Sequence, residues 1–379
     1  MSIDRGIILS PGRVNLMGEH VDYNDGIVLP AAIDRAVNLH FHRSTDGRIH
    51  LTAHDLGEEC TIQPHDLDQK RTIEGLPLPQ WALYPAGVGW NLLRYDYSVE
   101  GFYADFESNI PIGAGLSSSA AVEVGFAVLC EALGGWTLDR MTLARICQEA
   151  EHDYVGVNCG LMDQFACACG VQDHAVMLDT RNLSYRPVPL PPDTTLVIAD
   201  SSLRRSLVGS AYNDRRRDCE AAVAYFQAID PGIRALRDIS PEQFRTAEGK
   251  LPAGVYRHAR HVVEEIARVD EAIQYLENND AENFGQLMFA THRSLRDLYE
   301  VSCPELDILV DAAAGIEGCL GARLTGAGFG GCTVNLVQKQ TVGDFIERLG
   351  NTYLEKTGLR AEIFATQPSA GAHLVHPLK

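Results

Sequence analysis

ESNIPIGAGLSSSAAVE, residues 107–123, combines two glycines, three consecutive serines and the start of an apolar helical pattern. Gly113 and Gly115 let the backbone turn tightly and bring its N–H groups close to an anion, which a side chain at either position would hinder. The serines at 117–119 fall where the helix begins, and apolar residues recur at helical spacing from Ala120 onward. Because the unpaired amides and the positive dipole end of this helix point back at the loop, the segment predicts a phosphate-binding site.

The alternative is an ordinary loop whose serine caps the following helix, since helix starts are usually rich in Ser, Thr, Asn and Asp. Two common nucleotide motifs are excluded here, because no lysine follows the second glycine and the spacing is not G-x-G-x-x-G. The segment does resemble the P-x-G-x-G-L-S-S-S-A loop of the GHMP kinases, named for galactokinase and the homoserine, mevalonate and phosphomevalonate kinases. That resemblance implies an ATP-binding loop made of Gly113, Ala114, Gly115, Leu116, Ser117, Ser118 and Ser119.

Length, composition and charge limit the classes of protein that fit. A chain of 379 residues favours two domains at roughly 100–200 residues each. Its content of 45% hydrophobic and 22% charged residues is typical of a soluble globular protein. The formal net charge of −19 argues against a nucleic-acid-binding surface and against binding to anionic membranes, both of which need a basic field. To bind a nucleotide, the protein would therefore have to concentrate its few basic side chains at the site and bring a metal ion to it.

The cysteines and the N-terminal residues indicate a cytoplasmic protein. The ten cysteines lack the paired CxxC spacing of a zinc module, and several fall in apolar runs, so we expect reduced, buried thiols. The thirteen histidines contain no HExxH pair. The first residues, MSIDRGIILSPGRV, are too polar for a signal peptide, and no apolar run approaches the roughly 18 residues of a membrane span.

A second polar segment, GRVNLMGEHVDYNDGIVLP, occupies residues 12–30. Loops are normally polar, so the residues alone leave open a surface loop with an ion pair between Arg13 and Glu19. The segment resembles the galactokinase signature G-R-V-N-L-x-G-E-H-x-D-Y-N-x-G-x-V-L-P, which separates galactokinases from most other GHMP kinases. At the two variable positions, Met17 stands where isoleucine is usual and Val21 where threonine is common, and neither difference removes a ligand contact that the resemblance implies.

Local patterns predict short strands around this segment. Residues 7–9 form a predicted strand that ends at Ser10-Pro11-Gly12, and Asn24-Asp25-Gly26 predicts a turn into a strand at 27–29. Residues 37–42 alternate between apolar and polar side chains and predict a further strand.

Residues 138–154 carry an apolar stripe at helical spacing with Glu151 at its edge, and Gly156 ends the predicted helix. The following VGVNCGLMDQ places Asp163 in a glycine-flanked turn, where a buried, paired structural aspartate is one interpretation. This stretch resembles V-G-x-x-C-G-x-M-D-Q, the galactokinase segment that supplies the catalytic aspartate. The same resemblance makes Glu151 a magnesium ligand together with Ser119.

Prolines at 187–192 mark the expected boundary between a first domain, 1–192, and a second domain, 193–379. In the second domain Tyr212 precedes N-x-R-R-x-x-C, which resembles the galactokinase segment that carries a sugar-contacting tyrosine. The stretch RLTGAGFGGC at 323–332 has four glycines between two strand-like runs and alone would be a hairpin connection. It resembles the third conserved motif of the GHMP kinases, which implies a loop packed against the active site. A buried strand is also expected at 196–200, with amphipathic helices at 256–276 and 281–298.

All three superfamily motifs occur in order, so the resemblance to the galactokinases covers essentially the whole chain. It implies an α/β architecture of the α+β type with two domains. The first would have the ribosomal protein S5 domain 2-like fold and the second a ferredoxin-like fold, with the active site in the cleft between them. The implied reaction is transfer of the γ-phosphoryl of ATP to the C1 hydroxyl of α-D-galactose, with Mg²⁺ as cofactor.

Under this resemblance Asp163 accepts the proton of the C1 hydroxyl, while Arg13 keeps Asp163 ionised and neutralises charge at the reacting centre. The residues implied to hold the sugar are Glu19, His20, Val21, Asp22, Gly160 and Tyr212. A kinase for a related sugar, N-acetylgalactosamine or galacturonate, would carry the same motifs. A sugar sensor without catalysis is a second alternative, although the phosphate loop and Asp163 are complete here. We expect a monomer or a weak homo-oligomer that binds galactose and MgATP.

Overall fold

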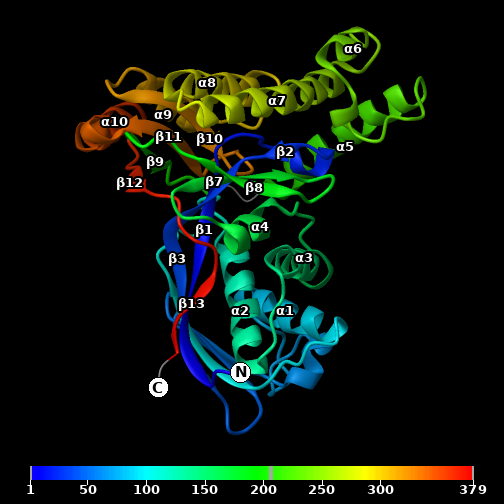
Figure 1. The fold of residues 1–379 in the computed structure, drawn as a ribbon, viewed down its shortest axis with the longest axis vertical. Coiled ribbons are helices and arrows are strands. Elements are labelled where there is room, and N and C mark those ends of the chain that lie inside the picture. Colours follow the sequence, from blue (N-terminus) through cyan, green and yellow to red (C-terminus); the bar gives the residue numbers. More distant parts are fainter. Residues whose placement is uncertain (1, 205–207, 378–379) are drawn as a thin grey trace.

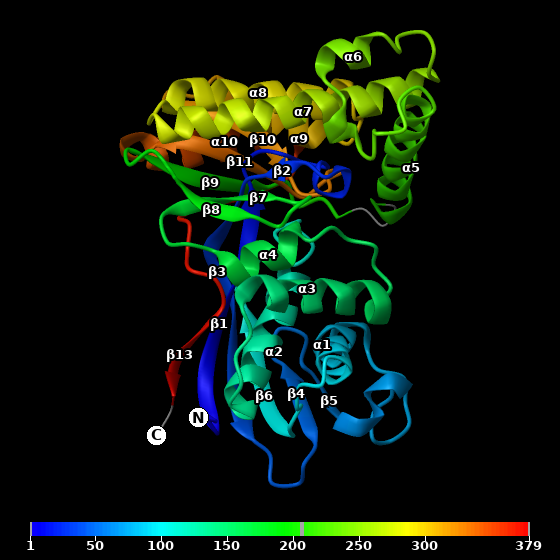
Figure 2. The same ribbon diagram turned by 45° about the vertical axis from the view of Figure 1, so that its right-hand side comes forward.

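The computed structural model describes residues 2–204 and 208–377, which form three sheets and the helices around them. A six-stranded sheet forms the lower part of the molecule in Figures 1 and 2, a four-stranded sheet lies above it under a layer of helices, and a three-stranded sheet lies between them. The first half of the chain supplies β1 (Arg5–Asn15), β2 (Ile27–Val28), β3 (Pro30–Arg43), β4 (Ile49–Ala53), β5 (Glu58–Ile62), α1 (Leu83–Arg94), β6 (Phe102–Ser108), α2 (Ser118–Gly134), α3 (Arg140–Ala150), α4 (Met162–Cys169), β7 (His174–Asp179) and β8 (Tyr185–Pro189). The second half supplies β9 (Thr194–Asp200), α5 (Val208–Gln227), α6 (Pro241–Arg245), α7 (Ala253–Glu277), α8 (Ala281–Asp297), α9 (Pro304–Ala314), β10 (Cys319–Thr325), β11 (Cys332–Gln338), α10 (Val342–Thr357), β12 (Glu362–Thr366) and β13 (His373–Pro377).

The six-stranded sheet has the order β13-β1-β3-β6-β4-β5. β1 pairs antiparallel with β3, with an irregular register between Pro11 and Arg13. The strand predicted at 7–9 therefore continues to Asn15, and the prediction that Ser10-Pro11-Gly12 ends it is wrong. A proline has no N–H for the ladder, and the register irregularity lets β1 pass this position without breaking. The strands predicted at 27–29 and 37–42 correspond to β2 and to part of β3.

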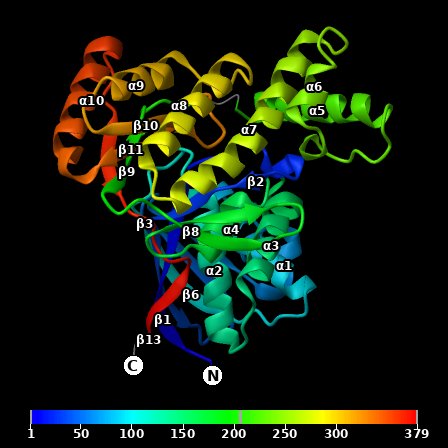
Figure 3. The same ribbon diagram turned by 45° about the horizontal axis from the view of Figure 1, so that its top comes forward.

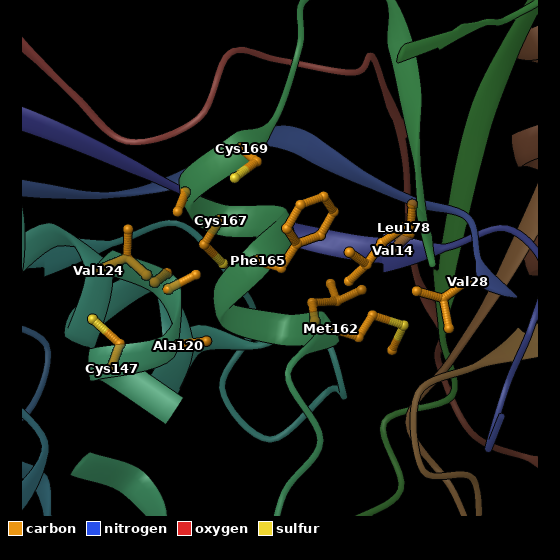
Figure 4. Packing of buried hydrophobic residues seen from close by; sticks show 14 of the residues in the cluster. Val14, Val28, Ala120, Val124, Cys147, Met162, Phe165, Cys167, Cys169 and Leu178 are labelled. Carbon is orange, nitrogen blue, oxygen red and sulfur yellow. The ribbon is translucent and has the colours of Figure 1, made fainter. Parts of the chain in front are cut away.

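Helix α2 lies against β1 and β3, and α1 and α3 pack on it (Figure 1). It is buried along most of its length, because neighbours cover it on several sides. Figure 4 shows part of the buried cluster that joins Ala120 and Val124 of α2 to Phe165 and Cys167 of α4 and to Val14 of β1. This packing fixes the beginnings of α2 and α4 relative to β1, and most of the predicted site residues of the first half lie there.

The four-stranded sheet is antiparallel, with the order β10-β11-β9-β12. Its chain order of β9, helices, β10, β11, α10 and β12 is the ferredoxin-like arrangement expected from the sequence. Helices α8, α9 and α10 pack on this sheet, while α5 and α6 lie at the end of the helical layer opposite α10 (Figure 3). Helices α7 and α8 confirm the predictions at 256–276 and 281–298, and β9 confirms the strand at 196–200.

The predicted boundary at residues 192/193 falls between β8 and β9, where the chain passes from the three-stranded to the four-stranded sheet. Part of the proline-rich stretch before it belongs to β8, an edge strand, where missing N–H donors do little harm. At the other end of the chain, β13 returns to the first sheet and pairs with β1 (Figure 1). The division into 1–192 and 193–379 stays a prediction, and it leaves one strand of the second segment in the first sheet.

The cysteines are the small buried hydrophobes that the sequence predicts. All ten are free thiols, and eight of them are buried. Burial raises the pKa of the Cys60 thiol to about 12, so this side chain packs as an apolar group. Across residues 2–204 and 208–377, no helix combines the length and the apolar character that crossing a membrane requires.

Candidate active site

A cleft at the junction of β1, α2, α4 and the β10–β11 loop brings the predicted site residues together. Its cavity has a volume of about 580 Å³. The predicted residues that line it are Arg13, Glu19, His20, Asp22, Gly113, Gly115, Leu116, Ser117, Ser118, Ser119, Glu151, Gly160, Asp163 and Tyr212. Val21 and Ala114 are fully buried and do not line the cavity. Gly326 and Ala327 complete its wall from the β10–β11 connection.

The phosphate loop needs its glycines both for conformation and for close packing. Gly113 and Gly115 have φ angles of 68° and 77°, in the left-handed region that glycine adopts without strain. The glycine-rich loop of the second half lies against it, since a Cβ atom on Gly326 would be 2.9 Å from Gly115 O and one on Gly331 would be 2.8 Å from Ala114 O. The sequence predicts that this second loop packs against the active site, and the structure places it in backbone contact with the first loop.

Arg13 and Asp163 form an ion pair in the cleft. Arg13 Nε and Nη2 donate to Asp163 Oδ1 at 2.8 and 2.7 Å, and Nη1 donates to Gly115 O at 2.6 Å. The arginine side chain is 5% exposed and the aspartate 30%, so Asp163 is the partner that faces the cleft. The turn expected at Asp163 is instead the first turn of α4, where the helix dipole favours a carboxylate.

The interpretation of Arg13 and Glu19 as a surface ion pair is wrong, because both are buried and each has another partner. Glu19 Oε1 pairs with Arg323 Nη2 at 2.7 Å and accepts from Gly326 N at 2.7 Å. Arg323, which is fully buried, also donates through Nη1 to Leu16 O at 2.9 Å. The segment 12–30 is therefore anchored by residues from the opposite half of the chain.

A turn of π-helix, Glu151–Val155, continues α3 and carries the predicted metal ligand. Such turns are frequent at functional sites. Glu151 Oε2 accepts from Gln164 Nε2 at 2.5 Å and from the Cys159 thiol at 3.3 Å, and Ser119 also hydrogen-bonds this carboxylate. Burial raises the pKa of Glu151 to about 7. The Glu151 carboxylate and the Ser119 hydroxyl therefore lie side by side in the wall of the cleft.

Gln164 and Glu123 belong to this cluster and were not among the predicted residues. Both are fully buried, and Gln164 Nε2 donates to Glu123 Oε2 at 2.9 Å as well as to Glu151. Burial, and then the neighbouring Glu151, raise the pKa of Glu123 well above its usual range. Their sequence positions carry a signal, because Gln164 directly follows Asp163 and Glu123 lies one helical turn after Ser119.

Asp22 and Gly160 fit together in the part of the cleft where the sugar is expected. A Cβ atom on Gly160 would lie 1.7 Å from Asp22 Oδ2, so the carboxylate occupies the space that any side chain at 160 would take. Burial, and then the nearby charge of Asp163, raise the pKa of Asp22 to about 7. The ring of Tyr212 lies 5.5 Å from that of His20, and burial lowers the pKa of His20 to about 3, so this imidazole is neutral.

Tyr299 is a buried neighbour of Tyr23 and His20 that no motif predicts. Its hydroxyl lies 2.7 Å from Tyr23 OH, which in turn lies 2.9 Å from His20 Nδ1. The Tyr299 ring is 4.7 Å from the ring of His20 and 4.6 Å from that of His261. A single tyrosine after a helix gives no local signal, so only the tertiary contacts reveal it.

Models of three protein families match the chain. The model described as GHMP kinases N terminal domain matches residues 84–171, and the Galactokinase galactose-binding signature matches residues 2–42. The model described as GHMP kinases C terminal matches residues 272–355. Together these segments contain the predicted phosphate loop, the polar segment 12–30 and the glycine-rich loop between β10 and β11.

Whole proteins match along nearly the full chain. A galactokinase of Roseiflexus sp. (strain RS-1) is 43% identical over 365 residues, which cover 96% of this chain and 92% of that protein. A galactokinase of Chloroflexus aurantiacus is 40% identical over 372 residues, covering 98% and 93%. The crystal structure of Lactococcus lactis galactokinase complexed with galactose matches with a TM-score of 0.92 and 33% identity, covering 98% of this chain and 95% of that one. A Methanococcus jannaschii mevalonate kinase, at 20% identity and a TM-score of 0.68 over 96% and 98% of the chains, shares the fold alone.

Proposed function

The chain belongs to the galactokinase family of the GHMP kinases, and we propose on that basis which residues of its cleft carry the reaction. The enzyme is an ATP-dependent sugar kinase that transfers the γ-phosphoryl of ATP to the C1 hydroxyl of α-D-galactose. The observation that carries our assignment is the Arg13–Asp163 ion pair, which lines the cleft beside the phosphate loop. The choice of galactose as the acceptor is tested by a coupled ATP-consumption assay across galactose, glucose, talose, galactosamine and N-acetylgalactosamine. Galactose should give the highest kcat/KM, and a higher value for N-acetylgalactosamine would point to a different acceptor.

Phosphoryl transfer needs alignment and charge neutralisation more than covalent chemistry from the protein. Asp163 accepts the proton of the C1 hydroxyl as that oxygen attacks, and Arg13 neutralises charge at the reacting centre. Backbone N–H groups at 113–119 and the positive end of α2 hold the phosphates. The contact of Arg13 with Gly115 O supports this division, because it ties the proton acceptor to the loop that holds ATP.

The donor set around Glu151 fits a magnesium ion. A carboxylate and a serine hydroxyl are hard oxygen ligands, and Mg²⁺ usually takes only one or two protein ligands besides water and substrate phosphates. Among the described residues no group of three or more His, Cys, Asp and Glu side chains is placed to hold a metal ion. Ser119 and Glu151 would hold the ion, which when bound supplies positive charge to the phosphates of ATP.

Ser119→Ala and Glu151→Ala should each raise the magnesium concentration that gives the half-maximal rate, because each removes one oxygen ligand. KM for galactose should hardly change. Titrating magnesium at saturating ATP and galactose measures this, with Glu149→Ala as a control that removes a carboxylate two residues from Glu151. An unchanged magnesium requirement in both test variants would contradict the metal assignment.

We assign the sugar to five residues that line the same cavity as Asp163, namely Glu19, His20, Asp22, Gly160 and Tyr212, with the buried Val21 contributing through its backbone. Galactose and glucose differ only in the orientation of the C4 hydroxyl. We assign Asp22 and Tyr212 to that hydroxyl and Glu19 to the C6 side of the ring. A site that hydrogen-bonds one hydroxyl leaves buried polar groups unpaired when the hydroxyl points elsewhere, so glucose should be a very poor substrate.

Tyr212→Phe keeps the ring and removes one partner of the C4 hydroxyl. It should cost galactose roughly 1–3 kcal/mol in transition-state stabilisation and leave the weak glucose reaction nearly unchanged, which narrows the ratio between them. Measuring kcat/KM for both sugars tests this, with Tyr275→Phe on α7 as the control, because the Tyr275 hydroxyl makes an exposed hydrogen bond to Glu271 outside the cleft. A ratio that stays at the wild-type value would mean that Tyr212 does not discriminate at C4.

We also predict a cytoplasmic enzyme that is a monomer or a weak homo-oligomer and does not bind nucleic acid or membranes. The net charge of −19 supports the last two points, because anionic surfaces repel such a protein. Cell fractionation tests the location, and light scattering coupled to size-exclusion chromatography measures the mass in solution. A stable tetramer at micromolar concentration would contradict the prediction.

A further inference from the structure

Ser117 has an unusual conformation for a serine at the start of a helix. It is the N-cap of α2, with φ 58° and ψ 46°, in the left-handed region. A capping serine normally has an extended backbone and accepts a hydrogen bond from an amide of the first turn. The Ser117 side chain makes no such bond. A non-glycine residue held in this region is strained, and such strain tends to persist where it has a task.

The Ser117 hydroxyl is directed at the carboxylate of Asp163. Ser117 Oγ donates to Asp163 Oδ2 at 2.5 Å, while the two Arg13 donors take Oδ1. Ser117 is only 9% exposed, so water competes little for this hydrogen bond. The two oxygens of the carboxylate are thus held from different elements, Oδ1 from β1 and Oδ2 from the beginning of α2.

We propose that Ser117 is a positioning residue for the proton acceptor, and that its hydroxyl fixes the carboxylate plane of Asp163 against the incoming sugar hydroxyl. This inference rests on the proposed role of Asp163. A carboxylate held at one oxygen can still rotate about its Cβ–Cγ bond, whereas bonds at both oxygens remove that freedom. The left-handed backbone at 117 directs the hydroxyl toward α4, so the strain and the hydrogen bond have one explanation. Within the serine run, the Ser117 hydroxyl then serves Asp163, while that of Ser119 bonds Glu151.

The test compares Ser117→Gly with Ser117→Ala. Both remove the hydroxyl, but glycine relieves the left-handed strain and alanine keeps it. We expect both to lower kcat for galactose about 10- to 100-fold, the effect of losing a hydrogen bond to a charged group, with KM for ATP changed by less than about threefold. Ser202→Gly is the matched control. That serine also has a left-handed backbone, with φ 61°, and its hydroxyl bonds Arg360 O at 2.7 Å, so its kcat should stay at the wild-type value.

Thermal unfolding checks that the variants are folded, and Ser117→Gly should be at least as stable as Ser117→Ala. A normal kcat in Ser117→Gly with a reduced one in Ser117→Ala would overturn the inference, because strain alone would then explain the loss. A raised KM for ATP with kcat unchanged would also overturn it, since the hydroxyl would then serve the phosphates.

A double-mutant comparison distinguishes the positioning role of Ser117 from the proton-acceptor role of Asp163. In an Asp163→Asn background, Ser117→Gly should lower kcat by no more than about twofold further, because the residue acts through Asp163. If the two losses multiplied, Ser117 would act independently and the inference would fail. If Asp163→Asn itself kept full activity, the assignment of the proton acceptor would fail. If both Ser117 variants had the wild-type kcat while Asp163→Asn was impaired, the positioning role of Ser117 would be wrong. The proton-acceptor role of Asp163 would stand.

Discussion

An Asp163→Ala variant should lose roughly 10²–10⁴-fold in kcat, with a much smaller change in KM for ATP. The loss of a positioned proton acceptor has this size. Asp163 is the carboxylate that two Arg13 donors and the Ser117 hydroxyl hold at the surface of the cleft, next to the loop that is proposed to hold the phosphates. The nucleotide contacts assigned to that loop do not include Asp163, so ATP should still bind.

Two controls keep this result interpretable. Asp163→Asn keeps the size of the side chain and one acceptor oxygen for Arg13, but it cannot take up the proton, so its kcat should fall almost as far. Asp105→Ala removes an exposed aspartate from β6 and should leave kcat unchanged. Steady-state rates at saturating substrates, with thermal unfolding as the check on folding, measure the effect. Half of the wild-type activity in Asp163→Ala would contradict the assignment.

Removing Arg323 should destabilise the protein by about 3–5 kcal/mol, the usual result of breaking a buried ion pair from one side. Arg323 is fully buried, and without it Glu19, which is also buried, would lose the cation that pairs with its Oε1. The carbonyl of Leu16 would lose a donor as well. Chemical denaturation of Arg323→Ala and the wild type measures the difference in the free energy of unfolding.

The matched control is Arg348→Ala on α10, whose pair with Asp344 is exposed on both sides. Surface pairs of this kind contribute less than about 1 kcal/mol. Equal losses in the two variants would mean that the buried pair adds little beyond a surface one. A larger loss in Arg323→Ala would fit an interior charge left without its partner.

The parts of the site that the sequence predicts are those encoded by neighbouring residues. The glycines and serines of the phosphate loop lie in a short pattern whose chemistry is local, whereas the roles of Arg13 and Asp163 follow from the resemblance of their short segments to the galactokinases. Arg323 and Glu19, by contrast, are in contact although more than three hundred residues separate them in the sequence. Tyr299 and Tyr23 are also hydrogen-bonded across a sequence separation of 276 residues. No spacing rule reports such pairs, because their proximity is a product of the fold.

Local rules were also overridden at two positions. Ser10-Pro11-Gly12 has the composition of a turn, yet pairing with β3 carries β1 through it, because the ladder on both sides outweighs a weak local preference. Ser117 has the residue type of a helix cap, yet its hydroxyl bonds Asp163. The ferredoxin-like fold of the second sheet was predicted only through the resemblance to the galactokinases, and the observed strand order agrees with it.

The pairing of β13 with β1 bears on how the newly made chain folds. The ribosome releases β1 long before β13, so the growing polypeptide has to carry β1 with one edge lacking its neighbour. An open strand edge of this kind can pair with other chains. Contacts between distant parts of a sequence also form slowly. Completion of the first sheet is therefore coupled to synthesis of almost everything that follows it, and a nascent chain stalled before β13 would expose that edge.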